Sequence, residues 1–425
     1  MSAPSRSVYY LSLTAIVWCL SFSLMKGWGE VHEWANVSWL MNYELGFIKR
    51  GLWGSLITWL TPNHVNINPQ YMADLGLPVF FLFLGVLLTI ALRLLSLSHH
   101  HWILLLLCLV FFTSPFLTML ANIRNYLDIP ISLLGILGLL SALKRHYLLA
   151  MVLLSLGVFI HELIIVIFSP LLVLLLMLQH AHCTPHQAAG TQAPVLPAEP
   201  AVSPWRLPAA WFAMVLPLLC LTLIVFNQQS LDLTALSTDI DQRLETLLAM
   251  DSDRAALYSE MLTHSFFDYL KEEAPLFERR ITDPQFVLTV GLFPAVIALM
   301  AWRLLYHLTL KRRLWLLLIT VGASVAPLTL HLIAFDTNRI WVMPILSSFL
   351  SLWLILEISP NKQLNEPIFP GLLLLCTWII YWLIEPVIMF NAALTLYQSD
   401  SLLAAFIPII WACYYTARSI SQQVR

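Results

Sequence analysis

Residues 148–179 read LLAMVLLSLGVFIHELIIVIFSPLLVLLLMLQ, which is a nearly continuous apolar run. Two polar breaks interrupt this run, His161-Glu162 and Ser169-Pro170. As one helix the run would be about 48 Å long, whereas the hydrocarbon core of a bilayer is about 30 Å thick. The run is therefore either one long membrane span or two shorter helices that turn at His161-Glu162.

The positions of the basic residues favour two helices, because cytoplasmic loops of membrane proteins are enriched in lysine and arginine. With two helices and a cytoplasmic N-terminus, the basic turns Lys144-Arg145 and Lys311-Arg312-Arg313 both face the cytoplasm. A single span would invert every later segment and place the triplet outside. We therefore predict two helices here, with both chain termini in the cytoplasm.

The composition extends this membrane assignment to the whole chain. Of the 425 residues, 59% are hydrophobic and 11% are charged, whereas about a quarter of a soluble domain is charged. The sequence predicts an all-α, polytopic transmembrane bundle of about 12 spans, some short or broken, in a single domain over residues 1–425. The formal charge of −2 gives no basis for a nucleic-acid partner. The predicted spans lie near residues 8–26, 77–97, 102–121, 130–143, 148–161, 163–179, 208–226, 287–305, 314–334, 340–357, 370–390 and 402–418.

Three longer segments lie between the predicted spans. Residues 27–76 form the first outer loop, and residues 180–207, rich in Ala, Pro and Gln, form a flexible cytoplasmic loop. Residues 227–285 form a second large outer segment, in which apolar residues and charged residues each recur at helical spacing. This segment predicts amphipathic helices on the outer surface. They are either a structural cap or a lid over a substrate.

The densest group of functional residue types lies in the first outer loop, where residues 42–54 read NYELGFIKRGLWG. Glu44, with Tyr43 beside it, precedes Lys49 and Arg50 by five and six residues. A carboxylate can accept a proton from a sugar hydroxyl, and Lys and Arg can hold a phosphate. The alternative is an interfacial helix that Lys49 and Arg50 anchor in the membrane.

Two further outer links carry charged residues. Arg124 and Asp128 are one helical turn apart, a spacing that favours either a substrate contact or a local ion pair. His161 and Glu162 are adjacent at the break described above. Because charges at membrane depth need partners, this pair is either a binding site for a hydroxyl or cation, or a satisfied polar turn.

Asp336 and Arg339 lie in a third link, and Glu385 is a weaker candidate near the end of a later span. Asp336 can instead be a helix cap. On the predicted topology all of these links open on one side of the membrane. The sequence therefore predicts a polar site on the outer face, covered by residues 227–285.

The layout resembles the GT-C superfamily of membrane glycosyltransferases. The resemblance rests on an acidic residue, Glu44, soon after the first span, and on the order of polar and apolar segments from Arg124 to Gln179. The segments NYELGFIKRGLWG and FDTNRIW (residues 335–341) are also similar to those of bacterial membrane proteins associated with surface polysaccharide assembly. Many members of the superfamily carry an acidic pair or an Asp in the first loop. Here a single Glu precedes Lys-Arg, which leaves the base and any metal open.

The resemblance implies a glycosyltransferase or polysaccharide polymerase of the bacterial inner membrane, with its active site facing the periplasm. It implies a polyprenyl-(pyro)phosphate-linked sugar donor and a glycan or lipid acceptor, and it leaves open a divalent cation, Mg²⁺ or Mn²⁺. Two alternatives from other classes are a flippase for a lipid-linked oligosaccharide and a non-catalytic envelope assembly subunit. In the enzyme hypothesis Glu44 is the general base, and His161 and Glu162 complete the catalytic group by positioning the acceptor or cation. The substrate and its phosphate are bound by Tyr43, Lys49, Arg50, Arg124 and Arg339, with Asp128 and Asp336 also positioning the acceptor or cation.

Overall fold

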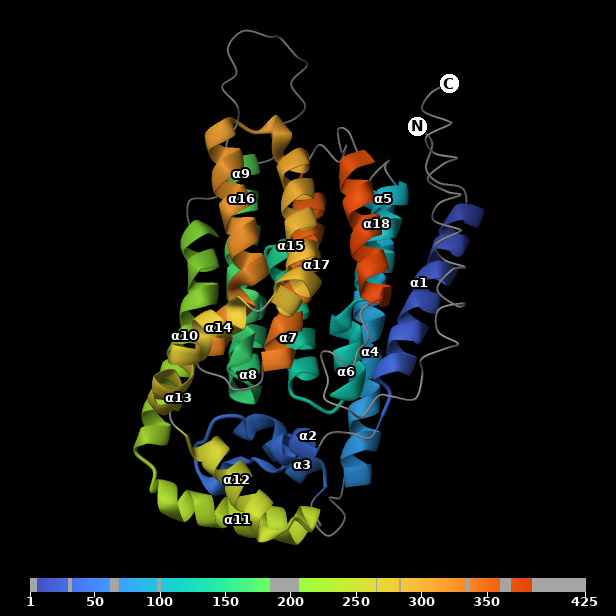
Figure 1. Ribbon diagram of the computed structural model, residues 1–425. Helices are drawn as coiled ribbons and strands as arrows, with labels where there is room; N and C mark the ends of the chain where they lie inside the picture. The colour runs from blue at the N-terminus through green and yellow to red at the C-terminus, as the bar shows by residue number, and fades with distance from the viewer. Residues whose placement is uncertain are drawn as a thin grey trace, which may run out of the picture.

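The structure, a computed structural model, describes residues 6–29, 33–61, 69–97, 101–183, 206–264, 266–282, 284–332, 337–359 and 368–383. Within these ranges every regular element is a helix (Figure 1), which confirms the predicted all-α class. The long bundle comprises α1 (Arg6–Gly27), α4 (Pro69–Leu97), α5 (His101–Phe112), α6 (Pro115–Asn122), α7 (Asp128–Leu143), α8 (Tyr147–Ile160), α9 (Leu163–Cys183), α10 (Arg206–Gln229), α15 (Pro284–Leu304), α16 (Leu310–Val325), α17 (Thr337–Ile358) and α18 (Ile368–Leu383).

The remaining helices lie outside the long bundle or are short turns that extend a bundle helix. They are α2 (Glu33–Leu40), η1 (Tyr43–Leu45), α3 (Gly51–Leu60), α11 (Leu233–Leu248), α12 (Ser252–Thr263), α13 (Phe266–Glu273), η2 (Ala274–Leu276), α14 (Phe277–Ile281), η3 (Leu305–His307) and η4 (Ala326–Leu332).

Among the described residues, six helical stretches are long and apolar enough to cross a membrane. Five shorter apolar helices coincide with further predicted spans, whereas the predicted span at 402–418 lies outside the described residues. The predicted number of about 12 spans therefore stays a prediction. The six long stretches are Val8–Gly27, Tyr71–Leu97, Trp102–Asn122, Leu163–Ala181, Leu310–Leu332 and Arg339–Ile358.

The apolar run at 148–179 is two helices, as predicted. Helix α8 ends at Ile160, and the next residue, His161, has extended backbone angles (φ −162°, ψ 129°). Gly157 lets the returning helix approach closely, because a Cβ there would lie 2.1 Å from Cδ1 of Ile164. The break therefore turns the chain and leaves His161 and Glu162 at the end of a helical hairpin.

Two predicted spans are interrupted where the sequence analysis took them as continuous. The span at 102–121 divides into α5 and α6 at Thr113-Ser114, directly before Pro115. The span at 314–334 changes from an α-helix to the 3₁₀ turns of η4 around Pro327. Proline lacks the N–H that continues the helical ladder and restricts the residue before it, which accounts for both interruptions.

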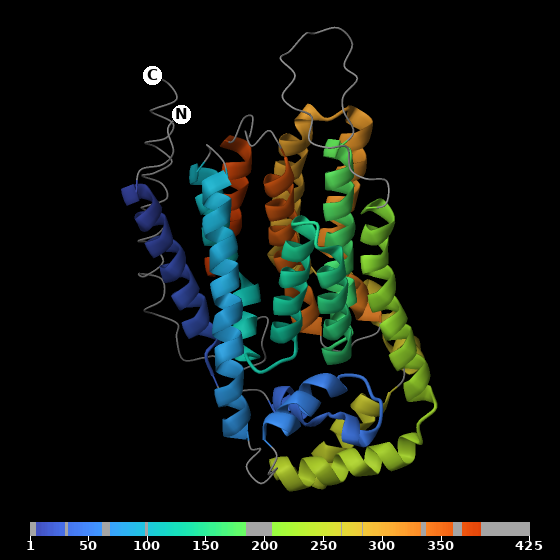
Figure 2. The ribbon, with the colours of Figure 1, turned by 180° about the vertical axis from the view of Figure 1, so that it is seen from behind.

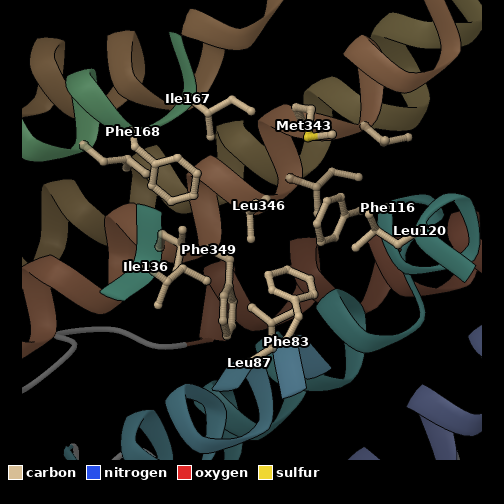
Figure 3. Packing of buried hydrophobic residues seen from close by; sticks show 14 of the residues in the cluster. Phe83, Leu87, Phe116, Leu120, Ile136, Ile167, Phe168, Met343, Leu346 and Phe349 are labelled. Atoms are coloured by element: carbon tan, nitrogen blue, oxygen red, sulfur yellow. The ribbon is translucent and has the colours of Figure 1, made fainter. Parts of the chain in front are cut away.

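The hydrophobic core lies along α5, α6 and α17, which are enclosed by the other helices. In the most apolar 18-residue stretches of Trp102–Asn122 and Arg339–Ile358, 94% of the residues are buried. In the corresponding stretch of Val8–Gly27, 28% of the residues are buried. The ring of Phe111 stacks on that of Phe349, with centroids 3.9 Å apart. In the close view of Figure 3, Phe349 of α17 lies between labelled side chains of α4 and α7. This packing fixes α17 at the centre, and Arg339 lies near its start.

The polar helices gather at one end of the bundle. Figures 1 and 2, which are opposite views, both place α2 and α3 between the bundle and the yellow-green helices α11 and α12. We call α11–α14 the cap. Asp232 and Asp251 start α11 and α12 by accepting hydrogen bonds from backbone N–H groups of each first turn. Helices thus occupy both segments, 27–76 and 227–285, although α4 already begins at Pro69. Most of the predicted loop at 180–207 lies outside the described residues.

Candidate functional site

Glycines set the shape of the first outer loop. Gly46 has a φ of +97°, which side-chain-bearing residues rarely adopt. A Cβ on Gly51 would lie 2.4 Å from the Tyr43 ring, and one on Gly54 would lie 2.0 Å from the backbone oxygen of Met41. The loop is therefore folded tightly against the first turns of α3. The close approach that these glycines permit is between two parts of the chain.

We expect Gly54→Ala to destabilise the protein by about 1–3 kcal/mol, because its methyl group would displace backbone that has little room to move. Gly85→Ala in α4 is the matched control, since a Cβ there meets nothing within 4 Å. The control should be neutral or stabilising by up to about 1 kcal/mol. Thermal unfolding in detergent measures both, and equal midpoints for the two variants would contradict the packing described.

Arg50 joins the first outer loop to the α8–α9 break. Its backbone is left-handed (φ 65°, ψ 10°), a conformation that costs a non-glycine residue free energy. Its Nη2 lies 2.8 Å from Oε1 of Glu162, and the two side chains are 15% and 27% exposed. Nδ1 of His161 lies 3.2 Å from Oε2 of the same carboxylate. The predicted residues Arg50, His161 and Glu162 therefore form one contact group.

A second ion pair joins the beginnings of α7 and α17. Nε of Arg339 lies 3.4 Å from Oδ2 of Asp128, and the side chains are 5% and 0% exposed. The guanidinium also lies over the ring of Tyr126, 4.6 Å from its centroid. This pair is 211 residues apart in sequence and almost completely shielded from water.

The two ion pairs are close enough to influence each other. Burial lowers the pKa of His161, and the charge of Arg50 lowers it further, whereas Glu162 and Asp128 act in the opposite direction. For Arg50, burial lowers the pKa, Glu162 raises it more, and the charge of Arg339 lowers it. We name the set Lys49, Arg50, Asp128, His161, Glu162 and Arg339 the polar cluster.

Lys49 connects the polar cluster to the cap. Its Nζ donates a hydrogen bond to the backbone oxygen of His264 (2.9 Å) and lies 5.3 Å from the ring centroid of Tyr269. Burial lowers the pKa of Lys49 to about 8, the charge of Arg50 adds to this effect, and Glu162 opposes it. The cap therefore covers the cluster and touches one of its cations directly.

Glu162 is held ionised. Burial alone would raise the pKa of this carboxyl, but the charges and hydrogen bonds of Arg50 and His161 bring it well below its usual value. While Arg50 stays in place, Glu162 is therefore an anion with little affinity for a proton.

Glu44 contacts the cap, whereas the sequence analysis expected it beside Lys49 and Arg50 as a base. Its Oε2 is 3.0 Å from Nη2 of Arg243 in α11, and its side chain is 53% exposed. Arg243 also donates to the side-chain oxygen of Asn42 (2.8 Å) and to the backbone oxygen of Leu40 (3.1 Å). Glu44 thus helps to dock the cap on the first loop. Tyr43, its neighbour, stacks on Phe47 with centroids 5.5 Å apart.

Arg124 likewise contacts residues outside the polar cluster. Its guanidinium lies 4.6 Å from the ring centroid of Trp28 and donates to the backbone oxygen of Ala121 (3.2 Å). The residue one turn later, Asp128, pairs with Arg339 instead. Of the other predicted residues, Asp336 and Glu385 lie outside the described residues.

Sequence reasoning missed the contributions of the cap. Arg243 and Tyr269 touch the first loop. Arg280 forms an ion pair with Glu273, and the side chains of Arg280 and Glu273 are 12% and 8% exposed. Arg280 also lies within 3.5 Å of the backbone oxygen of His331 in η4. These residues follow the amphipathic spacing of the cap helices, and only their three-dimensional neighbours distinguish them from other surface charges.

Comparison with known proteins adds no relative. No protein family, curated protein or solved structure matches the chain. Within the described residues no group of three or more His, Cys, Asp or Glu side chains is placed to hold a metal ion. A divalent cation therefore remains a prediction of the sequence analysis, and the functional argument rests on the polar cluster.

Proposed function

We propose that the protein is a membrane glycosyltransferase or polysaccharide polymerase that uses a polyprenyl-(pyro)phosphate-linked sugar on the periplasmic face. The observation that supports this most is the polar cluster, in which Lys49, Arg50 and Arg339 gather at one end of an apolar bundle. A lipid-linked donor needs such an arrangement, because its chain lies in the bilayer while its phosphate lies at the surface.

The charge balance of the cluster suits an anionic ligand. Three cations, Lys49, Arg50 and Arg339, stand against two carboxylates, so one positive charge remains when His161 is neutral. A phosphate can accept two parallel hydrogen bonds from each guanidinium. As the glycosidic bond breaks, negative charge grows on the departing phosphate, and cations placed beforehand stabilise that transition state.

We assign the proton-accepting role to Glu162. When Arg50 turns to a bound phosphate, it stops lowering the pKa of Glu162, while burial continues to raise it. The acceptor hydroxyl then gives its proton to Glu162, and its oxygen forms a bond to the anomeric carbon. The bond from that carbon to the phosphate oxygen breaks, and the phosphate leaves with the electron pair.

Glu44, the base expected from the resemblance, has a structural role in this proposal, because it is bound to Arg243 and more than half exposed. We expect Glu162→Gln to lower transfer about 10²–10⁴-fold, as loss of a general base does. Glu44→Gln should lower it much less. The initial rate of sugar transfer in proteoliposomes measures both, and the reverse order would return the base role to Glu44.

Binding tests the phosphate role without knowledge of the sugar. The probe is undecaprenyl phosphate, with undecaprenol as the uncharged control, added to the full-length protein in nanodiscs. We expect Arg50→Gln to weaken binding of the phosphate at least about tenfold, since a hydrogen bond to a charged group contributes about 1.5–3 kcal/mol. Arg93→Gln is the matched control, because Arg93 also pairs with a glutamate, Glu357, at 2.9 Å. The cluster is not a phosphate site if undecaprenol binds as tightly as undecaprenyl phosphate. The same conclusion follows if Arg93→Gln weakens binding of undecaprenyl phosphate as much as Arg50→Gln does.

Lys49 predicts a pH dependence. With a pKa of about 8, Lys49 is charged below that pH and neutral above it. The second ionisation of a phosphate monoester has a pKa of about 6 and is nearly complete by pH 7. Raising the pH from 7 to 9 should therefore weaken binding of undecaprenyl phosphate to the wild type but not to Lys49→Arg. A flat profile for the wild type would exclude Lys49 from the site.

A further inference from the structure

A second basic group lies on the turn between α15 and α16, at the end of the bundle away from the cap (Figure 1). Residues 284–332 contain no Asp or Glu, and they carry four basic residues close together, Arg303, Lys311, Arg312 and Arg313. Lys311 and Arg312 are exposed. The proposed reaction at the polar cluster makes no use of these residues.

Arg313 is held in place by one aromatic ring of α15 and one of the turn η3 that follows it. Its guanidinium carbon lies 3.6 Å from the ring centroid of Trp302 and 4.9 Å from that of Tyr306. Contacts of this kind attract the cation to the ring face and restrict a side chain that would otherwise sample many rotamers. The charge is therefore fixed before any ligand arrives.

The neighbouring helices supply little negative charge. Helices α9, α15 and α17 pack against α16. In these three helices the one acidic residue is Glu357, and Arg93 of α4 already binds it at 2.9 Å. The described residues around the turn therefore carry more positive than negative charge, which suits an anionic ligand.

An apolar stripe leads from these charges along α16. Leu310, Leu314 and Leu318 follow each other at intervals of four, on one helical face, and are 60%, 44% and 62% exposed. Tyr306 and Trp315, 62% and 58% exposed, flank the basic turn. Such rings favour the depth of lipid headgroups. A ligand that fits this surface has an anionic head and a long apolar chain.

We propose that the α15–α16 turn binds an anionic glycerophospholipid of the surrounding bilayer. Arg313, with Lys311 and Arg312, holds the phosphodiester, and one acyl chain lies along Leu310, Leu314 and Leu318. This site is independent of the polar cluster and of the proposed transfer reaction.

Native mass spectrometry of the full-length protein tests the site, with phosphatidylglycerol as the probe and phosphatidylcholine as the neutral-headgroup control. We expect the wild type to bind phosphatidylglycerol at least about fivefold more tightly, and Lys311→Gln/Arg312→Gln to remove that preference. The matched control is Lys144→Gln/Arg145→Gln, which removes two exposed cations from the α7–α8 turn and should leave the preference intact. Trp302→Leu keeps every charge but loses the ring that holds Arg313, and should weaken binding about two- to threefold.

Three results would overturn the proposal. The first is equal binding of the two phospholipids to the wild type. The second is an equal loss of the preference for phosphatidylglycerol in both double variants, which would mean that any basic turn of the protein can bind this lipid. The third is tighter binding of undecaprenyl phosphate than of phosphatidylglycerol in a Lys311-dependent manner, which would make the occupant a carrier lipid. Thermal unfolding in detergent confirms that each variant is folded.

Discussion

Arg50→Ala is expected to lower sugar transfer by about 10²–10³-fold, the effect of removing one preorganised group that stabilises transition-state charge. The substitution removes a guanidinium that lies 2.8 Å from Glu162 and that we assign to the phosphate. Arg50→Lys keeps the charge but not the two parallel hydrogen bonds, so it should retain more activity than Arg50→Ala. Initial rates with a lipid-linked donor in proteoliposomes measure the difference.

The backbone of Arg50 calls for a control, because its left-handed conformation (φ 65°) is unfavourable for alanine as well. Glycine adopts this conformation at no steric cost. Arg50→Gly should therefore be at least as stable as Arg50→Ala and equally inactive. Full activity in both Arg50→Ala and Arg50→Lys would remove Arg50 from the site.

The buried pair of Asp128 and Arg339 should have the largest effect on stability. Replacing either residue by alanine leaves the other charge, 5% or less exposed, without its partner, and should destabilise the protein by about 3–5 kcal/mol. Asp128→Leu/Arg339→Met removes both charges and should be considerably less harmful than the sum of the single changes. Denaturant unfolding in detergent measures this double-mutant cycle.

The exposed pair of Arg93 and Glu357 serves as the comparison. The Arg93 side chain is 59% exposed, so solvent screens this pair, and its removal should change stability by about 1 kcal/mol or less. If single changes at Asp128 and Arg339 are as mild as those at Arg93, or add without coupling, the pair does not hold the beginnings of α7 and α17 together.

Much of the fold followed from the sequence, because apolar run length and basic turns are local properties. The turn at His161-Glu162 is the best example, since its position decided the orientation of every later helix. The same reasoning placed Arg50, Asp128, Glu162 and Arg339 in links on one side of the membrane. Their contacts in the polar cluster agree with that placement.

The pairing of these residues did not follow from the sequence. Local spacing offered Arg124 as a partner of Asp128, beside the alternative of a substrate contact, because side chains one helical turn apart are neighbours. The structure pairs Asp128 with Arg339, since α7 and α17 begin side by side and the chain between Asn122 and Asp128 is a turn rather than a helix. Contacts between distant segments depend on packing, which no spacing within one segment reveals.

Glu44 shows the same limit. Its position after the first span suggested a catalytic carboxylate, and only the cap, some 200 residues later, shows that Arg243 binds it. The cap residues themselves carried no signal beyond amphipathic spacing. The sequence therefore predicted that these links lie near one another better than it predicted the contacts of each side chain.

The most direct test of the proposed function is a complementation experiment in the source organism. The gene is deleted, surface glycans and lipid-linked oligosaccharides are profiled, and wild type, Glu162→Gln and Arg93→Gln are reintroduced at matched membrane levels. We predict that the deletion removes a glycan and leaves its lipid-linked precursor on the periplasmic face, and that Glu162→Gln fails to restore the glycan while Arg93→Gln succeeds. Accumulation of the precursor on the cytoplasmic face, or full restoration by Glu162→Gln, would contradict the proposal that the polar cluster transfers a sugar.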